Sequence, residues 1–262
     1  MSKLTEILKL FSKKESTKHP TSAVILAAGT GSRFGNELGK KQFREIAGIP
    51  ALVLTLTAFE QCELIDEIVI VTGAEDIERC QNYVNEKKFA KVTHIVAGGA
   101  DRQASAKLGF DAINPQSEFV AIHDAARCLV TPEIIAQTLK ASFEHGAAVA
   151  AEPSRDTVKI ATESGFAAET PDRSLVWLVK TPQCFLANMY RAAIYEAEQE
   201  NFRATDDSQL VEKLGFKVKM VDCGSENIKL TYPIDARIAE TIYLARQKEV
   251  VTLPAGVEEA KK

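Results

Sequence analysis

Residues 23–35 read Ala23-Val-Ile-Leu26-Ala-Ala-Gly29-Thr-Gly-Ser-Arg33-Phe-Gly35. The apolar run from Ala23 to Leu26 is typical of a strand buried on both faces, and small residues and glycines follow it directly. Glycines at such a point let backbone N–H groups approach a phosphate closely. The stretch therefore predicts a buried first strand that ends in an anion-binding loop.

Beyond this loop, apolar strand-like runs alternate with helical patterns. We expect strands at 67–72, 92–96, 119–122, 147–151 and 218–221, and helices at 52–59, 74–85, 102–112, 132–145, 186–200, 205–214 and 233–247. Thr131 is the expected N-cap of one helix, with Pro132 at its first position. Repeated β-α-β units predict an α/β fold, a Rossmann-like and mostly parallel sheet with helices on both faces.

The alternation breaks between Glu152 and Lys180. Short β-like runs at Thr157–Ile160 and Leu175–Leu178 surround a polar segment that contains Gly and Pro. We interpret residues 152–180 as a β-hairpin arm that protrudes from the domain. The expected organisation is an N-terminal amphipathic extension (1–20), one domain (21–250) that includes the arm, and a disordered tail (251–262).

Composition excludes several classes of protein. The 262 residues are 45% apolar and carry a formal net charge of −4, so no overall basic field favours nucleic acid as a partner. The five cysteines are widely spread without a C-x-x-C motif, which fits core-filling thiols in a reducing compartment and argues against a zinc site. No apolar run reaches the ~18–20 residues of a transmembrane helix. We therefore expect a cytoplasmic protein.

The first residues form a basic amphipathic pattern, with Leu4, Ile7, Leu8 and Phe11 on one helical face. Charged residues interrupt the apolar positions, so the segment does not resemble a secretory signal peptide. Two readings stay open, a short helix packed on the domain or frayed, and a helix that lies on a membrane surface. We expect the first, and no membrane partner.

Two common nucleotide motifs fail at the first loop. Phe34 stands where the dinucleotide fingerprint needs its third glycine, and the run from Gly35 to Lys41 is one residue short of a P-loop and lacks its hydroxyl residue. The loop does gather Arg33, Lys40 and Lys41, and fixed cations suit the negative charge of a triphosphate. A solvated charged loop is the alternative reading of these three residues.

Further short motifs occur in order along the chain: Gly98-Gly-Ala-Asp-Arg-Gln-Ala-Ser105, His123-Asp-Ala-Ala-Arg127, Asp156-Thr-Val-Lys159, Thr181-Pro-Gln183, Thr205-Asp-Asp207 and Asn227-Ile-Lys229. With the first loop and Lys41-Gln-Phe43, they resemble the sugar-phosphate nucleotidyltransferases and, among them, the 2-C-methyl-D-erythritol 4-phosphate cytidylyltransferases. The resemblance covers about residues 22–244. It implies transfer of CMP from CTP to 2-C-methyl-D-erythritol 4-phosphate with release of pyrophosphate, in the synthesis of isoprenoid precursors.

The resemblance also implies roles for single residues in binding CTP. The CTP-binding set is Ala27, Ala28, Gly29, Gly31, Gly99, Ser105 and Ala125. The catalytic set is Arg33, Lys41, Asp124 and Lys229. Of these, Arg33 and Lys41 are expected at the triphosphate, with Lys41 at the α-phosphate. Arg102 is expected to orient its loop rather than touch the ligand.

Magnesium and the acceptor complete the expected site. Asp124 ends a strand at the carboxyl edge of the sheet and is a candidate Mg²⁺ ligand, and Glu226 is a candidate second one. The resemblance also places Asp124 against ribose or substrate hydroxyls, and a simple strand-end turn residue is the remaining alternative. The expected acceptor-binding residues are Arg127, Thr157, Arg173 and Thr181, together with Lys229. In the family, the arm that carries Thr157 and Arg173 crosses to a second subunit, which implies a homodimer with arm exchange.

Two alternatives are kept. Ribitol-5-phosphate cytidylyltransferases share the chemistry, but they tend to have Ala-Gly-Gly where this chain has Ala27-Ala28-Gly29, and Trp177 also favours the methylerythritol enzymes. A non-catalytic nucleotide-binding regulatory protein is the alternative of another class. The chain departs from the family pattern at Lys40, where proline is usual, which puts the rigidity of the first loop in doubt. Cys128 also replaces a usual proline, and we expect little effect there.

Overall fold

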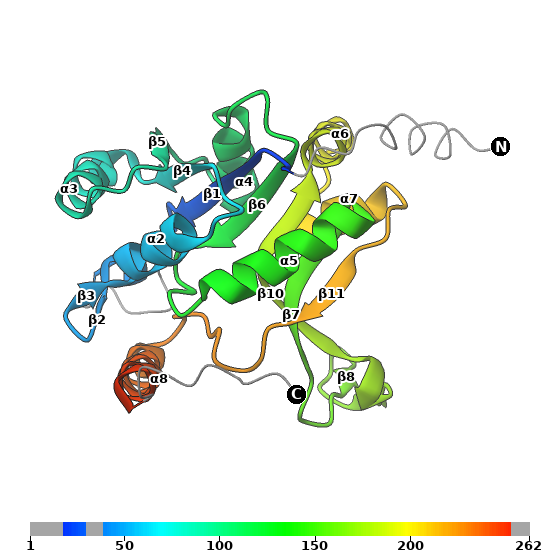
Figure 1. Cartoon of the computed structure of the whole chain (residues 1–262). Coiled ribbons are helices and arrows are strands. Elements are labelled where there is room, and N and C mark those ends of the chain that lie inside the picture. Colours follow the sequence, from blue (N-terminus) through cyan, green and yellow to red (C-terminus); the bar gives the residue numbers. More distant parts are fainter. Residues whose placement is uncertain (1–17, 30–38, 253–262) are drawn as a thin grey trace, which may run out of the picture.

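The computed structural model describes residues 18–29 and 39–252, and the side chains of the described residues up to Lys248. Most of the expected N-terminal extension and tail lies outside these residues, as do Gly31 and Arg33. A seven-stranded sheet forms the centre, in the order β11-β7-β10-β6-β1-β4-β5 (Figure 1). Its strands are β1 (Thr21–Ala27), β4 (Glu67–Thr72), β5 (Val92–Ala97), β6 (Phe119–Asp124), β7 (Ala147–Pro153), β10 (Trp177–Leu186) and β11 (Lys219–Asp222).

The helices follow the strands as the alternation predicts: α2 (Ala51–Gln61), α3 (Ile77–Lys87), α4 (Arg102–Asp111), α5 (Pro132–His145), α6 (Ala187–Gln199), α7 (Asp207–Lys213) and α8 (Pro233–Thr252). Short elements lie between them: η3 (Lys41–Phe43), β2 (Glu45–Ile46), β3 (Ile49–Pro50), η4 (Ala74–Asp76), β8 (Ile160–Ala161), β9 (Ala167–Glu169) and η5 (Arg173–Leu175). No helix among the described residues is both long enough and apolar enough to cross a bilayer.

Two apolar layers enclose the sheet, because successive side chains of a strand point to opposite faces. Ala23 and Ile25 of β1 pack with α2, α3 and α5, whereas Val24 packs with α4, α6 and α7. Figure 1 shows α2 and α5 lying across one of these faces. The fold is therefore α/β with helices on both faces, as the sequence predicts.

The parallel strands bring the first loop beside the end of β6. Leu26 pairs with Asp124, and Ala27 pairs with Thr72 on the other side of β1. The segments that follow β1 and β6 thus begin side by side at the carboxyl edge of the sheet. Ligands of open α/β sheets bind at this edge.

Helix α5 begins and ends where its sequence signals predict. The Thr131 hydroxyl accepts a hydrogen bond from the backbone N–H of Ile134 at 3.3 Å, and Pro132 is the first helical residue. Gly146 follows the last turn with a φ of 82°, a left-handed conformation that glycine adopts without a side-chain clash. Both predicted boundaries are confirmed.

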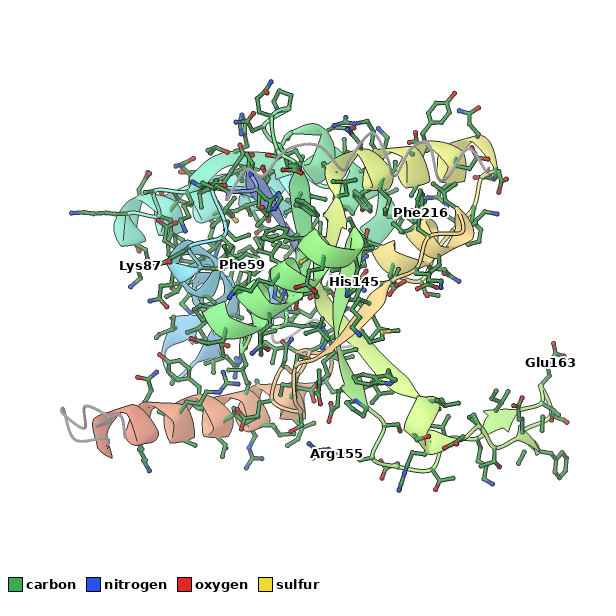
Figure 2. The ribbon with its side chains drawn as sticks, turned by 45° about the vertical axis from the view of Figure 1, so that its right-hand side comes forward. Phe59, Lys87, His145, Arg155, Glu163 and Phe216 are labelled. Carbon is green, nitrogen blue, oxygen red and sulfur yellow. The ribbon has the colours of Figure 1, made fainter. Side chains whose placement is uncertain are left out.

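The arm differs from its prediction in three respects. The β-like run at 175–178 is wrong for Leu175 and Val176, because Leu175 ends the short helix η5 and β10 begins only at Trp177. The β-like run at 157–160 is wrong for 157–159, since only Ile160 enters a strand, and that run has no long partner strand to pair with. Conversely, β10 continues through Lys180 to Leu186, where no strand was expected, and inserts antiparallel between β6 and β7. The arm is therefore the extended β7–β10 ribbon with a small β8–β9 hairpin on it. Figure 2 shows it projecting from the body, with Glu163 at its far end.

An ion pair holds the base of the arm. Lys180 of β10 lies 2.7 Å from Glu152 of β7, and its side chain is only 8% exposed. Its Nζ also donates to the Gly224 carbonyl at 3.1 Å. These contacts join both strands of the arm to the loop after β11.

Candidate active site

A cleft of about 410 Å³ opens at the carboxyl edge of the sheet, where β1 and β6 end. Segments that are far apart in the sequence supply its walls. It is lined by Leu26, Ala27, Ala28, Gly29, Lys41, Gln42, Gly99, Ala100, Asp101, Arg102, Ser105, Asp124, Ala126 and Lys229. Most of the expected CTP-binding and catalytic residues that the structure describes therefore share one cleft.

Gln42 holds the first loop in shape. Its side chain is 2% exposed, and its Nε2 donates to the Ala27 carbonyl at 2.6 Å and to the Gly29 carbonyl at 3.1 Å. Lys40, which replaces the usual proline, forms ion pairs with Glu75 and Asp76. These contacts anchor the loop from outside. The role of Gln42 was not predicted, although the Lys-Gln-Phe motif contains it.

Two adjacent glycines let the opposite wall approach the first loop. A Cβ on Gly98 would lie 2.4 Å from the Ala28 Cβ, and a Cβ on Gly99 would lie 2.6 Å from the Ala104 Cβ. The Gly99 N–H donates to the Ser105 hydroxyl at 3.1 Å, and that hydroxyl donates to the Asp101 carbonyl at 2.8 Å. Ser105 is 4% exposed, so it shapes the turn that lines the cleft.

Asp124 lies between two cations. Its Oδ1 accepts from Arg102 Nε at 3.0 Å and its Oδ2 accepts from Lys229 Nζ at 2.5 Å. Burial alone would raise the pKa of Asp124, but the charges of Arg102 and Lys229 outweigh it and hold this pKa well below its ordinary value. The carboxylate is therefore ionised throughout the physiological range.

A buried hydrogen-bond chain fixes the backbone of Asp124. Burial lowers the pKa of His123 to about 3, so its ring is neutral near pH 7. His123 Nε2 lies 3.3 Å from the Arg127 carbonyl, which can only accept, so Nε2 carries the proton. Its Nδ1 then accepts from the Thr181 hydroxyl at 3.0 Å, and that hydroxyl accepts the Asp124 N–H at 3.1 Å.

Arg127, which was expected to bind the acceptor, does not line the cleft and contacts Asn227 in the loop after β11. Arg127 Nη1 donates to the Asn227 carbonyl at 3.0 Å, and Asn227 Nδ2 donates to the Thr181 carbonyl at 2.9 Å. Arg127 Nε and Asn227 Oδ1 are buried and have no hydrogen-bond partner among the described residues. A buried polar atom without a partner costs about 1–3 kcal/mol.

Several expected site residues lie outside the cleft of their own chain. Ala125 is fully buried, and its N–H donates to the Leu26 carbonyl at 3.0 Å, while its neighbour Ala126 lines the cleft instead. Thr181 is 3% exposed and acts on His123 and Asp124. Thr157 and Arg173 are exposed on the arm, where Arg173 donates to the Arg155 carbonyl at 3.1 Å.

The residues present fit a magnesium ion through one carboxylate. Asp124 uses two of the roughly four lone pairs of a carboxylate on Arg102 and Lys229, which leaves acceptor capacity towards the cleft. Glu226 is exposed and pairs with Arg246 at 2.8 Å, so the structure does not bring it to Asp124. The described residues contain no group of three potential metal-ligating side chains. A Mg²⁺ ion commonly takes one or two carboxylates and completes its shell with phosphates and water.

The comparison with protein families decides among the readings of this cleft. Residues 21–245 match the model of the 2-C-methyl-D-erythritol 4-phosphate cytidylyltransferases, which is nearly the whole described domain. The chain belongs to this family. Its members of the same name from Caldanaerobacter subterraneus and Symbiobacterium thermophilum are 44% and 42% identical over 84% and 85% of this chain, and over 96% and 92% of their own lengths.

Solved structures of the family have the same fold. A 4-diphosphocytidyl-2C-methyl-D-erythritol synthase from Anaerococcus prevotii is 33% identical, with a TM-score of 0.77 over 87% of this chain and 99% of its own. A 2-C-methyl-D-erythritol 4-phosphate cytidylyltransferase from Thermus thermophilus is 30% identical, with a TM-score of 0.69 over the same shares. The resemblance of the motifs and the fold class that it implies are confirmed, and the chain is an enzyme of the nucleotidyltransferase class.

Proposed function

We propose that the protein transfers CMP from CTP to 2-C-methyl-D-erythritol 4-phosphate and releases pyrophosphate, a step of isoprenoid precursor synthesis. The observation that carries the proposal is the cleft that joins Ala27–Gly29, Lys41 and the Arg102–Asp124–Lys229 group in a chain of this family. The five buried free cysteines suit a reducing compartment, so we assign the reaction to the cytoplasm.

The reaction needs no covalent enzyme intermediate, because the nucleophile is already an anion. A phosphate oxygen of the acceptor attacks the α-phosphorus of CTP and forms the new P–O bond. The bond from that phosphorus to the bridging oxygen breaks, and its electron pair leaves with pyrophosphate. Lys41 and Lys229, which both line the cleft, supply fixed positive charge to the phosphates during this in-line transfer. Positioning and charge neutralisation are thus the contributions of the protein.

The nucleotide fits between the two small-residue walls of the cleft. Ala27, Ala28 and Gly29 leave room for a flat pyrimidine and ribose, and backbone amides of such loops can read the edge of a base. Gly99, in the loop before α4, and Ser105, in α4, complete that pocket. Mg²⁺ would be held by Asp124 and by phosphate oxygens of CTP, and it would neutralise phosphate charge there.

The acceptor phosphate would bind on the side of Arg127 and Lys229. Lys229 lines the cleft and supports this placement, since a fixed ammonium and the N–H groups of an arginine both suit a phosphate. Thr157 and Arg173 would join from the arm of a second subunit. Large apolar side chains exposed on the arm support such an exchange: Ile160 (50%), Phe166 (74%), Leu175 (80%) and Leu178 (51%).

Pyrophosphate release tests the proposal directly. The purified protein is incubated with Mg²⁺, CTP and either 2-C-methyl-D-erythritol 4-phosphate or ribitol 5-phosphate, with UTP and ATP as nucleotide controls. We expect turnover with CTP and the methylerythritol phosphate alone. Turnover restricted to ribitol 5-phosphate would make the enzyme a ribitol-5-phosphate cytidylyltransferase. CTP binding without any turnover would support a regulatory protein.

A further inference from the structure

A second carboxylate, outside the cleft lining, holds the far side of Arg102. Arg102 Nη1 donates to Asp207 Oδ2 at 2.6 Å, while Nε of the same guanidinium donates to Asp124 at 3.0 Å. Asp207 lies at the start of α7, 105 residues away in the sequence, and is 1% exposed. One planar guanidinium therefore connects a buried carboxylate to the cleft carboxylate.

The apolar core fixes the orientation of Asp207. Its Oδ1 accepts the Tyr190 hydroxyl at 2.6 Å, and Tyr190 is fully buried. The ring of Tyr190 stacks on Phe185 with centroids 5.1 Å apart and meets the edge of Phe110 at the same distance. Asp207 cannot rotate without breaking a hydrogen bond to one of the best-packed side chains of the core.

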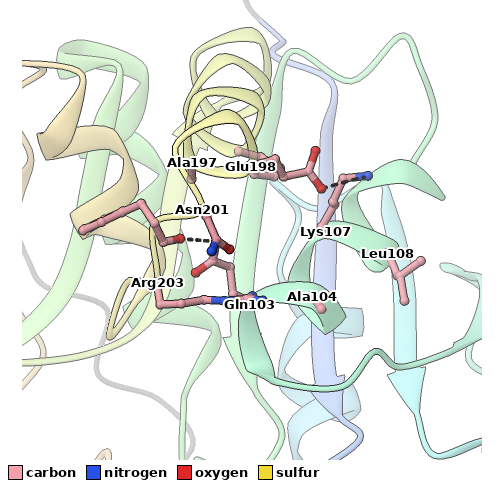
Figure 3. A pocket seen from close by; sticks show the side chains of 10 residues that line it. Gln103, Ala104, Lys107, Leu108, Ala197, Glu198, Asn201 and Arg203 are labelled. Carbon is pink, nitrogen blue, oxygen red and sulfur yellow. Dashed lines mark hydrogen bonds and ion pairs between the residues drawn. The ribbon is translucent and has the colours of Figure 1, made fainter.

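Polar contacts also fasten the loop before α7 to α4, the helix that carries Arg102. Gln103 Nε2 donates to the Phe202 carbonyl at 3.2 Å, and Gln103 Oε1 accepts the Ala204 N–H at 3.1 Å. Arg203 pairs with Asp101 at 2.9 Å. Figure 3 shows Gln103 of α4 facing Asn201 and Arg203 across the hollow between α4 and α6. These contacts between α4 and the loop before α7 help to fix the distance between Arg102 and Asp207.

We infer that Asp207 is a positioning residue, which acts through Arg102 to hold the Asp124 carboxylate in its working orientation, and that Tyr190 supports it. The inference deepens the proposed function, because it rests on Asp124 acting on the bound nucleotide or its metal ion. The four groups alternate in charge, in the order Asp207, Arg102, Asp124 and Lys229. Arg102 therefore contacts both carboxylates, and Lys229, which lines the cleft, contacts Asp124 as well.

The electrostatics of Arg102 agree with this arrangement. Burial alone would lower the pKa of Arg102, yet the charges of Asp207 and Asp124 outweigh it and raise this pKa above its ordinary value. Without the Asp207 charge, Arg102 keeps one anionic partner, and its long side chain is free to adopt rotamers that turn Nε away from Asp124. Misplacement of a catalytic group by about 1 Å can cost about 100-fold in rate.

Asp207→Asn removes the charge and keeps the shape of the side chain. Asp206→Asn is the matched control, since it removes one charge at the adjacent position and asparagine remains a good N-cap for α7. We expect Asp207→Asn to lower kcat at least about 10-fold with KM for CTP changed less than about 3-fold, and Asp206→Asn to stay within about 2-fold of wild type. Equal effects of the two variants would overturn the inference.

A double-mutant cycle separates positioning from a general loss of structure. If Asp207 acts through Arg102 on Asp124, Asp207→Asn should lower kcat less than about 2-fold in an Asp124→Asn background. A loss of the same factor in both backgrounds would overturn the inference. Should Asp207→Asn fail to fold, Tyr190→Phe serves instead, because it keeps the ring and removes only the hydroxyl. It is then expected to lower kcat about 3-fold in the wild-type background alone, and an unchanged kcat would count against the inference.

A readout independent of turnover completes the test. In protein with ¹⁵N-labelled arginine, the Nε–H signal of Arg102, assigned with Arg102→Lys, should exchange slowly with water in wild type and in Asp206→Asn. It should exchange faster or shift in Asp207→Asn. An unchanged signal in Asp207→Asn would show that Asp207 does not hold Arg102. If wild type lacks turnover with every acceptor, the proposed function fails, while this measurement still decides the role of Asp207.

Discussion

At the scale of single residues, the cleft combines charged groups at its surface with a neutral imidazole beneath them. His123 directly precedes Asp124 in β6 and is fully buried, and its ring connects Thr181 to the Arg127 carbonyl. A protonated ring would need a second acceptor, and Thr181 would have to reverse its hydroxyl. The neutral state of His123 is therefore part of the geometry that presents Asp124.

The buried His123 predicts a specific acid sensitivity of folding. Its folded-state pKa, about 3, lies below the unfolded value of about 6.5, so the unfolded chain binds one more proton between these values. The contribution of His123 to the free energy of unfolding is constant above about pH 6.5. It falls as the pH drops towards 3, by up to about 1.4 kcal/mol per pH unit. Urea unfolding between pH 4.5 and 7.5 measures how the free energy of unfolding changes with pH. Below about pH 6.5 this slope should correspond to one proton fewer taken up on unfolding in His123→Asn than in wild type. An identical slope in the variant would mean that His123 titrates normally.

Lys41 predicts a large effect on the rate. It lines the cleft next to the glycine loop, where it can meet charge that shifts at the α-phosphate. Lys41→Ala should lower kcat about 10²–10³-fold while CTP still binds, since the interaction is strongest in the transition state. Steady-state kinetics with calorimetric measurement of CTP binding would check this. A folded Lys41→Ala protein with nearly normal kcat would disprove the role.

At the scale of secondary-structure elements, the sequence correctly predicted the strands and helices whose residues carry a clear local pattern. The β-branched run of β4 and the Thr131 and Gly146 signals of α5 defined their elements correctly. The strand β10 was missed beyond Leu178 because Lys180, Thr181 and Gln183 are polar, although the fold buries them. Their burial is stabilised by partners such as Glu152 and Asp206, which no local pattern reveals.

The residues of the site also fall into those that could be predicted from the sequence and those that could not. The position of Asp124 in the cleft could be predicted because it ends β6, and the carboxyl ends of parallel strands meet at one edge. The position of Ala27–Gly29 in the cleft agrees with the family resemblance of their motif. Asp207 and Tyr190 could not be assigned a role, because helix packing brings them to Arg102 from far along the chain. Thr181 and Ala125 were expected to contact ligands, whereas the structure buries both and shows them hydrogen-bonded to neighbouring segments.

At the base of the arm, we expect loss of the buried ion pair to destabilise the protein more than loss of an exposed ion pair to the same glutamate. Glu152→Gln leaves Lys180, whose side chain is 8% exposed, without its ionic partner, and should lower the free energy of unfolding by roughly 3 kcal/mol. Arg155→Ala removes the other, 70% exposed partner of Glu152 and should cost less than about 1 kcal/mol. Chemical denaturation measures both. Equal losses in the two variants would show that burial of Lys180 does not matter.

At the scale of the whole molecule, the arm is a structure without a core of its own. Its two-stranded β8–β9 sheet is exposed on every residue, and large apolar side chains of the arm face solvent in a single chain. Isolated two-stranded hairpins are marginally stable in water. Under the proposed arm exchange, a second copy of the chain would bury these side chains and bring its cleft Thr157 and Arg173.

Mixing two inactive variants tests arm exchange. Arg173→Ala and Lys41→Ala should each be nearly inactive alone. A mixed dimer contains one site with the intact loop of the first chain and the intact arm of the second, so co-refolding should restore up to roughly a quarter of wild-type activity by random pairing. If heterodimers form and the mixture stays inactive, Arg173 acts within its own subunit.

The position of β10 between β6 and β7 also has a consequence for the order of events during synthesis. The first five residues of β7 are all buried. Among the described strands, β7 pairs only with β10 and β11, which are made later. At roughly 5–20 residues per second, a ribosome needs roughly 2–7 s to add the stretch from Ser154 to Leu186. During that interval the sheet of β6, β1, β4 and β5 can already exist, while an apolar strand emerges with nothing to pair with. Nascent chains that have reached the arm but not β10 should therefore be the ones that chaperones bind most.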